Sequence, residues 1–98
     1  MIEMKYKYRQ GIILVRICGV YLLVPTREAS EICPEIIRLT LFGATVLEAI
    51  ENERDLSDIS KAFQKLTRRS ASEVDDRIRS LLNDYLEKGY LVQVEDDG

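Results

Sequence analysis

The chain lacks the side chains on which most self-sufficient enzyme sites depend. It contains no histidine, so no Ser-His-Asp triad can be built, and it has no GxGxxG or GxxxxGK[ST] loop to hold a phosphate. Its two cysteines, Cys18 and Cys33, have no third soft ligand nearby, whereas a zinc site takes about four Cys or His ligands. We therefore expect no enzyme activity, no catalytic residue, no metal and no cofactor.

The thiols and the apolar runs also bear on the compartment. A disulfide between Cys18 and Cys33 is geometrically possible. A single bridge would stabilise the fold little, however, and free cysteine side chains are often simply buried. Apolar runs such as Gly11 to Val15 are far shorter than the ~18 residues of a membrane helix, and charged residues interrupt any signal-peptide core before Gly11. We expect buried free thiols, a cytoplasmic chain and no membrane partner.

Length and composition indicate one small domain. The chain has 98 residues, of which 46% are hydrophobic and 32% charged, a balance typical of a globular protein with a modest core. We expect a single domain over residues 1–98 with an ordered core over about residues 6–94.

The N-terminal half has the pattern of strands. Residues from Tyr6 to Pro25 are rich in Ile, Val, Leu and Tyr, and Cys18-Gly19 suits a tight hairpin turn. Ile12, Leu14 and Arg16 would share one face of the hairpin, and Ile13, Val15 and Ile17 the other. Both faces are largely apolar, so at least one needs a covering layer of helices. A polar loop over 25–34 leads to a third strand over 35–40.

The C-terminal half has the pattern of three helices, each opened by a capping residue. Thr40 caps a helix from Leu41 to about Glu51, and Asp55 caps a second that ends near Thr67. Ser70 and Glu73 match a capping box that opens a third helix, which stops at Lys88-Gly89. A short strand over 91–94 follows. Three antiparallel strands followed by three helices predict an α+β fold of the winged helix-turn-helix type.

Nucleic-acid binding is the usual function of such a fold, but the charges disfavour it. The third helix carries three basic residues against five acidic ones, a net charge of −2, where a DNA reader needs Lys and Arg. Lys65, Arg68 and Arg69 form a small basic cluster that is typical of a solvated turn. We expect no nucleic-acid partner, and a winged-helix DNA-binding transcription regulator remains the alternative.

The third helix has an apolar face wider than a simple core stripe. Val74, Ile78, Leu81 and Tyr85 form a narrow stripe, while Leu82 and Leu86 lie to one side of it, beside Asp75 and Arg79. The extra width either packs on the other helices or lines a groove. If the third strand is a sheet edge beside this flank, its unpaired N–H and C=O groups would form a slot for an extended peptide.

A set of short motifs extends over most of the chain, from about Tyr8 to Val92. They are Leu39-Thr40, Gly43-Ala44, Leu47-Glu48-Ala49-Ile50, Asp55-Leu56-Ser57-Asp58-Ile59, Ser72-Glu73-Val74, Arg77-Ile78, Leu81-Leu82 and Leu86-Glu87-Lys88-Gly89-Tyr90-Leu91. Together they resemble the PqqD family. The family usually has Asn, an aromatic residue and an acidic residue where this chain has Thr40, Leu47 and Arg77.

The resemblance implies a RiPP recognition element, a domain that binds the leader segment of a ribosomally made precursor peptide. Such domains add the leader as a strand beside the third strand, against the third helix, and present the core to a modifying enzyme, often a radical S-adenosylmethionine protein. The expected main-chain ladder is Glu35, Ile36, Ile37, Arg38, Leu39 and Thr40. The expected apolar wall is Val74, Ile78 and Leu82, with Asp75 and Arg79 as rim charges. Arg38 would also pair with an acidic leader residue.

A third hypothesis is a structural subunit that supports an enzyme without binding a leader. The sequence leaves open the precursor, the modification, the partner enzyme and the oligomeric state, because an exposed edge strand can also pair with itself.

Overall fold

The structure, a computed structural model, describes residues 5–94. Its elements are β1 (Lys5–Tyr8), β2 (Ile12–Ile17), β3 (Val20–Pro25), α1 (Ala29–Ile32), β4 (Ile37–Leu39), α2 (Leu41–Glu51), α3 (Leu56–Thr67), α4 (Ala71–Lys88) and β5 (Leu91–Val94). The fold is α+β with antiparallel strands, as expected. One antiparallel sheet has the order β2-β3-β4, and a separate two-stranded sheet pairs β1 with β5.

The element order differs from the expectation in two places. The predicted first strand divides at Arg9–Gly11, so that β1 leaves the hairpin and pairs with the C-terminal β5. The predicted loop over 25–34 contains the short helix α1. The N–H of Ala29, its first residue, donates to the Thr26 carbonyl, and that of Ser30 donates to the Arg27 carbonyl. Both features depend on contacts that a local pattern does not carry.

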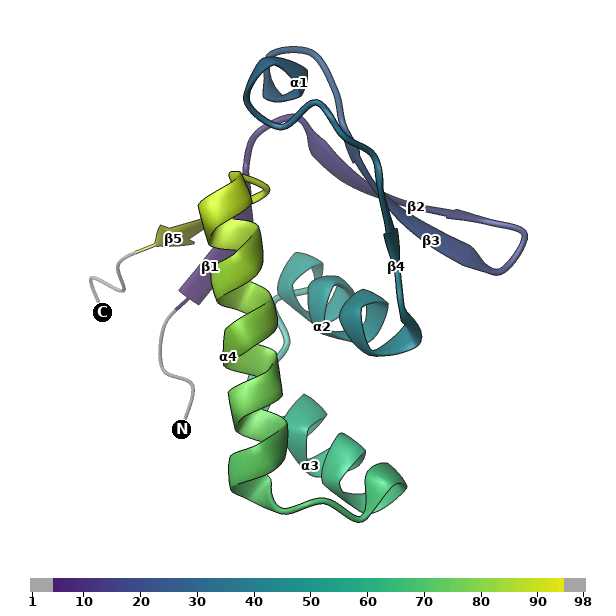
Figure 1. Cartoon of the computed structure of the whole chain (residues 1–98), viewed down its shortest axis with the longest axis vertical. Coiled ribbons are helices and arrows are strands. Elements are labelled where there is room, and N and C mark those ends of the chain that lie inside the picture. Colours follow the sequence, from purple (N-terminus) through teal and green to yellow (C-terminus); the bar gives the residue numbers. More distant parts are fainter. Residues whose placement is uncertain (1–4, 95–98) are drawn as a thin grey trace.

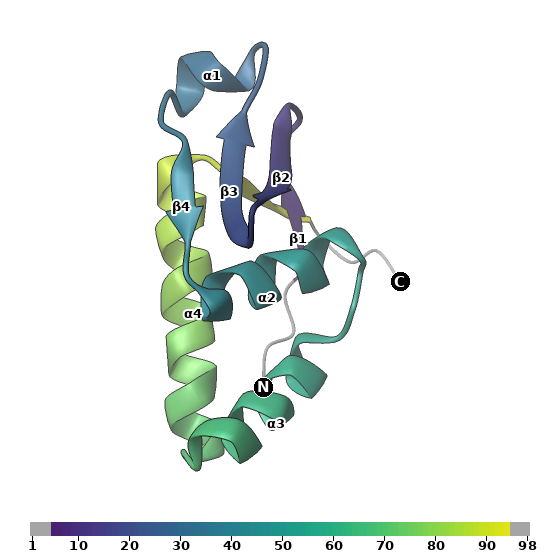
Figure 2. The same cartoon turned by 90° about the vertical axis from the view of Figure 1, so that its right-hand side faces the viewer.

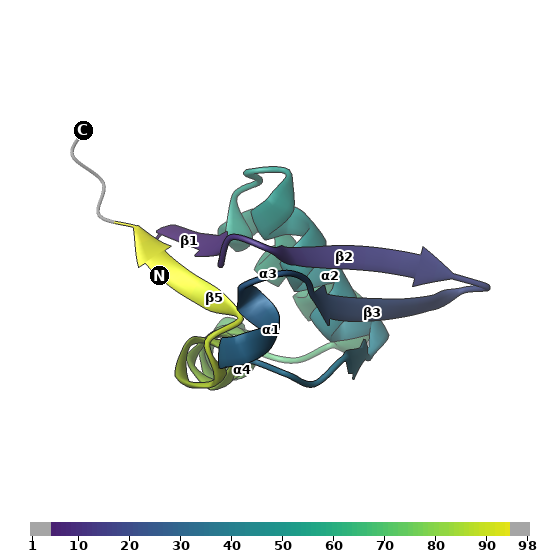
Figure 3. The same cartoon turned by 90° about the horizontal axis from the view of Figure 1, so that it is seen from above.

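The predicted hairpin turn is confirmed. Ile17 pairs with Val20 across the two-residue turn of Cys18 and Gly19, which have φ of 50° and 78°. Positive φ at both turn residues matches the right-handed twist of the flanking strands. The hairpin tip therefore projects straight out of the sheet, away from the helices (Figures 1 and 3).

Gly11 fixes the junction between β1 and β2. It has a φ of +96°, and its carbonyl accepts hydrogen bonds from the main-chain N–H and the hydroxyl of Thr26, at 2.8 and 2.5 Å. A Cβ atom at this position would lie 2.6 Å from the Thr26 carbonyl oxygen. The close approach of two chain segments thus requires glycine here.

Two of the three predicted helix caps hold the ends of α2 and α3. The Thr40 hydroxyl accepts a hydrogen bond from the N–H of Gly43 at 3.1 Å, and the Asp55 carboxylate accepts one from the N–H of Ser57 at 2.9 Å. These bonds from Ser57 hold the pKa of Asp55 below its ordinary value. Each cap satisfies a helix N–H group that has no partner within the helix.

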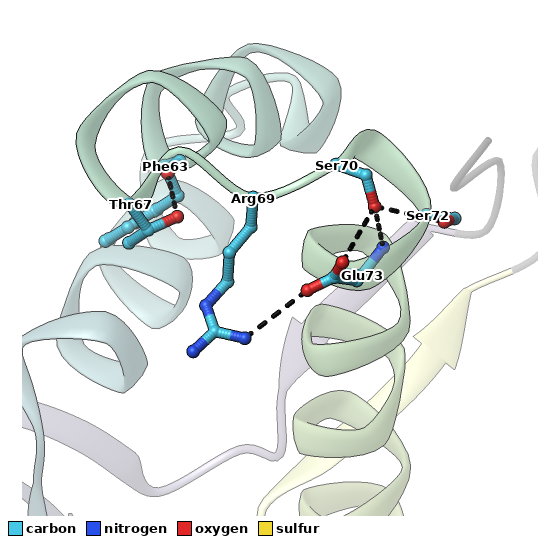
Figure 4. A network of polar contacts seen from close by, with 6 residues as sticks. All are labelled: Phe63, Thr67, Arg69, Ser70, Ser72 and Glu73. Carbon is cyan, nitrogen blue, oxygen red and sulfur yellow. Dashed lines mark hydrogen bonds and ion pairs between the residues drawn. The ribbon is translucent and has the colours of Figure 1, made fainter.

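The predicted capping box opens α4. The Ser70 hydroxyl accepts from the N–H of Glu73 and also lies 3.3 Å from the Glu73 carboxylate, which Arg69 reaches from the preceding turn (Figure 4). Gly89, with a φ of +90°, ends the helix. The sequence thus predicted the limits of all three long helices.

The core lies between the sheet and the helices. Its fully buried side chains include Leu23 of the sheet, Val46 and Leu47 of α2, Ile78 and Leu82 of α4, and Leu91 of β5. α4 runs along the side of the molecule, past β4, α2 and α3 (Figure 2). The expectation that helices cover one face of the hairpin is confirmed, because Ile12 is buried and Leu14 packs against the core.

The two cysteine side chains differ in burial. Both thiols are free, but only Cys33 is buried, where burial raises its pKa; Cys18 lies exposed at the hairpin tip, so its expected burial is wrong. A turn that projects from the sheet has no layer to cover it.

Among residues 5–94, no helix combines the length and apolar character needed to cross a membrane.

Candidate functional site

The strand β4 forms one open edge of the three-stranded sheet. It pairs with β3 alone, and within residues 5–94 no strand lies on its other side. The C-terminal strand β5, which could have covered this edge, pairs with β1 in the other sheet instead. The condition stated from the sequence, that the third strand lies at a sheet edge, is therefore met among residues 5–94.

The hairpin geometry determines which main-chain groups face this edge. In a two-residue hairpin the residues that flank the turn, Ile17 and Val20, exchange both of their hydrogen bonds. Bonding alternates along the strand, so Leu22 also directs its N–H and C=O towards β2. Arg38 stands opposite Leu22 and therefore directs its own N–H and C=O away from β3. One donor and one acceptor at the centre of β4 face the open edge.

The flank of α4 next to this edge is the one that carries Arg77 and Leu81. The Cβ position of Gly43 lies 3.5 Å from the Leu81 side chain and 3.9 Å from that of Leu39, which places Leu81 at the corner between β4 and α2. The Arg77 guanidinium lies 5.9 Å from the centre of the Phe42 ring. β4 overlaps the upper part of α4 in Figure 2, while Figures 1 and 3 show the two elements separated across the molecule.

Exposed apolar side chains stand at both ends of β4. Ile36, just before the strand, is 62% exposed, and Leu41, just after Thr40, is 76% exposed. Half-buried Phe42 packs edge-on against Phe63 of α3, with ring centres 4.8 Å apart. The edge therefore combines unpaired main-chain groups with apolar surface.

The segment before β4 is tied to the end of α4. The Tyr90 hydroxyl donates a hydrogen bond to the Glu35 carbonyl, and the Tyr90 ring packs edge-on against Tyr85. Burial raises the pKa of Tyr90, so its hydroxyl remains a donor at neutral pH. The Tyr90 hydroxyl takes one of the two lone pairs of the Glu35 carbonyl, and the strand itself spans only Ile37–Leu39 of the expected 35–40.

The predicted ladder residues divide by face. Ile37 is half-buried and Leu39 buried, so both point into the core, whereas Arg38 is exposed on the outer face. Thr40 uses its side chain to cap α2. The strand spans three residues because the chain turns into α2 directly after Thr40.

The predicted apolar wall is wrong. Val74, Ile78 and Leu82 are 3%, 0% and 0% exposed, so their side chains fill the core and cannot contact an added peptide. The extra apolar width of α4 packs on the rest of the protein, which was the other interpretation of the pattern.

The predicted rim charges lie on the wrong flank. Asp75 accepts a hydrogen bond from the buried Ser60 hydroxyl of α3 at 2.5 Å, and Arg79 forms an ion pair with Asp76 at 3.5 Å. At 100° per residue both lie across the helix from Leu81. Sequence periodicity gives the width of an apolar face but not the flank that meets the sheet, so Arg77 and Leu81 were missed.

A surface hollow of about 690 Å³ lies elsewhere, between β1 and the connection from α2 to α3. It is lined by residues of both charge signs: Lys5, Lys7 and Arg54 with Glu51, Glu53 and Asp55. This lining indicates no single class of ligand. Strand addition requires an edge, not a cavity, so the hollow does not compete with β4 as the candidate site.

The described residues, 5–94, contain no group of three His, Cys, Asp or Glu side chains that could hold a metal ion. Comparison of the chain with protein-family models, with curated proteins and with solved structures finds no match in any of the three. The geometry of the β4 edge and the motifs in the sequence are therefore the evidence on function.

Proposed function

We propose that this chain is a leader-peptide-binding domain, a RiPP recognition element of the PqqD-like kind. An extended peptide adds to β4 as a fourth strand of the sheet, against the Arg77–Leu81 flank of α4, and is presented to a modifying enzyme. The observation that carries the proposal is the open β4 edge, where the N–H and C=O of Arg38 face outwards between exposed Ile36 and Leu41.

The proposed fold type is a winged helix-turn-helix arrangement. Two features support it: the projecting β2–β3 hairpin, which would be the wing, and the short turn between α3 and α4 around Arg68, whose φ is 56°. In this arrangement the peptide edge lies on the side of the sheet away from the wing strand β2.

Energetic magnitudes indicate what the peptide must supply. Ordering each peptide residue costs roughly 1 to 2 kcal/mol of backbone entropy, while each net hydrogen bond contributes only about 0.5 to 1.5 kcal/mol. A three-residue strand offers few such bonds. Two or three peptide side chains, each contributing about 1.5 to 3 kcal/mol on burial, must therefore pack on Ile36, Leu41 and Leu81.

Charge gives a second element of specificity. Arg38 is exposed on the outer face of β4, and Arg77 lies beside the edge over Phe42. Two guanidinium groups along one peptide path favour a leader with acidic residues next to its apolar anchors.

A matched pair of substitutions at Arg38 tests the proposal. Arg38→Pro and Arg38→Thr both remove the side-chain charge, but only proline also removes the outward N–H. The probe is a synthetic peptide that carries acidic residues next to apolar anchors, as argued above for the leader, and the readout is affinity by calorimetry. We expect Arg38→Pro to bind roughly tenfold more weakly than Arg38→Thr, because one hydrogen bond is lost and a peptide carbonyl is left unpaired.

The folded state of both variants is checked by circular dichroism. Equal affinity of the two folded variants would show that the peptide does not pair with β4, and the proposal would fail.

A further inference from the structure

Within the part of the chain that the structure describes, the opposite edge of the same sheet, β2, is also open and lacks the usual protection. In the sheet order β2-β3-β4 it pairs with β3 alone, over six residues from Ile12 to Ile17. Its register is continuous, with no bulge, and the strand contains no proline or lysine and only one charge, Arg16. Proteins normally protect an edge of this length with such devices.

The outer face of the sheet is apolar next to this edge. The pairs Ile13–Val24, Val15–Leu22 and Ile17–Val20 all point to the side away from the core, and Ile13 and Ile17 are 46% and 54% exposed. The outer face carries no acidic residue, and its one charge, Arg38, lies on the far strand β4. The apolar surface thus extends directly up to the open β2 edge.

We infer that β2 pairs with β2 of a second copy of this chain, antiparallel about a two-fold axis, to give a six-stranded sheet. A strand edge is self-complementary in this arrangement, because residue i of one copy bonds residue j of the other and the reverse. Directly opposed residues must lie on the same face of the sheet. A two-fold pairing must therefore be centred on one residue that stands opposite itself.

The structure selects Val15 as that residue. Because Ile17 and Val20 exchange their bonds, Leu14 and Arg16 direct their N–H and C=O groups to the open edge. Centring on Leu14 would require the N–H of Ile12, which already donates to the Arg9 carbonyl at 2.9 Å. Centring on Arg16 would place two like charges opposite each other.

Centring on Val15 satisfies every constraint at once. Leu14 of each copy then exchanges main-chain bonds with Arg16 of the other copy, and Ile13 stands opposite Ile17 on the outer face. The two outer apolar faces join on one side of the sheet. The hairpin tip projects clear of the helices (Figures 1 and 3).

A second copy fits this edge better than a larger partner surface does. A six-residue strand edge gives a contact at the low end of specific interfaces, and its only charged residue is Arg16. The dimer is accordingly reversible and grows with protein concentration. Both β4 edges remain free at the two ends of the six-stranded sheet, so this pairing does not depend on peptide binding.

Arg16→Pro and Arg16→Thr form the matched test. Both remove the charge, and only proline removes the outward N–H without touching the bonds to β3. In sedimentation over a wide concentration range, the wild type and Arg16→Thr should rise from 11.3 kDa towards twice that mass, and Arg16→Pro should stay at 11.3 kDa. A wild type that stays at 11.3 kDa throughout, or a folded Arg16→Pro that dimerises equally, would overturn the inference.

Cross-linking tests the register. In the Val15-centred dimer the two Val15 Cα atoms are about 4.5 Å apart, within the range of a disulfide, whereas the two Cys18 residues are about 20 Å apart at ~3.4 Å per residue. Under a mild oxidant, Val15→Cys in a Cys18→Ser background should form a covalent dimer and the wild type should not. A covalent wild-type dimer through Cys18, or none from Val15→Cys, would contradict this register.

Discussion

Two adjacent leucines of α4 have different roles. Leu82 is fully buried among the core side chains, whereas Leu81 is half-buried at the corner where β4 meets α2. One step along a helix turns the side chain by about 100°, which is enough to move it from the core to the edge of the sheet. Leu81 therefore reports on the proposed binding edge, and Leu82 on stability.

The first prediction concerns Leu81. Leu81→Ala should weaken leader-peptide binding by roughly tenfold, because a buried contact of about 1.5 kcal/mol or more is lost at the edge. Leu86→Ala is the matched control, since Leu86 is also half-buried but lies on the opposite flank of α4. Calorimetry with the same peptide compares the two variants. Equal loss in both would remove Leu81 from the binding edge.

The second prediction concerns Leu82. Leu82→Ala should lower the free energy of unfolding by about 2 to 5 kcal/mol, because it leaves a cavity beside Ile78 in the core. Urea unfolding followed by circular dichroism measures the change. A loss below 1 kcal/mol, within the ordinary range for surface positions, would contradict the placement of Leu82 in the core.

At the scale of elements, the sequence predicted the features that depend on neighbouring residues, and it did not predict the strand pairing that joins the two ends of the chain. Thr40, Asp55 and Ser70 revealed where the helices begin, because a cap acts within three residues of chain. The sequence also predicted the hairpin turn at Cys18-Gly19. The pairing of β1 with β5 joins residues about 86 positions apart, for example Tyr8 with Leu91 at 83, and no local pattern specifies it.

The candidate site shows the same division. The sequence predicted a third strand over 35–40 from its β-branched centre, and gave its position at a sheet edge beside the third helix as a condition that the structure meets. It did not predict which flank of α4 faces that strand. That choice depends on how α4 crosses the sheet, which places Leu81 next to Gly43.

The third prediction is the pH dependence carried by the Asp55 cap. Bonds from Ser57 lower the pKa of Asp55 in the folded state, so the charged carboxylate stabilises the fold above the ordinary aspartate pKa. This contribution is lost as the pH falls through the lowered pKa. Asp55→Asn keeps an oxygen acceptor but cannot titrate, so its stability should fall less steeply from neutral pH to about pH 3. Identical acid slopes in urea unfolding of both proteins would contradict this.

At the scale of the whole molecule, charge separates the proposed function from its alternative. The chain has a net charge of −3, and α4, which would enter the DNA groove in a winged-helix regulator, carries a net −2. A sheet with two open edges offers strand pairing on both sides instead. These charges and edges favour the proposed peptide partner over DNA.

The fourth prediction follows from this charge. Gel-shift titration with duplex DNA at low salt should give no complex, because an acidic α4 repels the phosphate backbone. The small basic turn of Lys65, Arg68 and Arg69 would oppose this, but Arg69 is already paired with Glu73 at 3.3 Å. A complex that weakens steeply with added salt would favour the DNA-binding alternative.

The most direct test of the account is a nuclear magnetic resonance titration of isotope-labelled protein with the leader peptide. If the peptide adds to β4, the amide signals of Ile37 to Thr40 and of Arg77 and Leu81 should shift first. Cross-strand contacts should then appear between the peptide and Arg38. Shifts confined to Lys65, Arg68 and Arg69, or an unchanged Arg38 amide at saturation, would contradict strand addition at this edge.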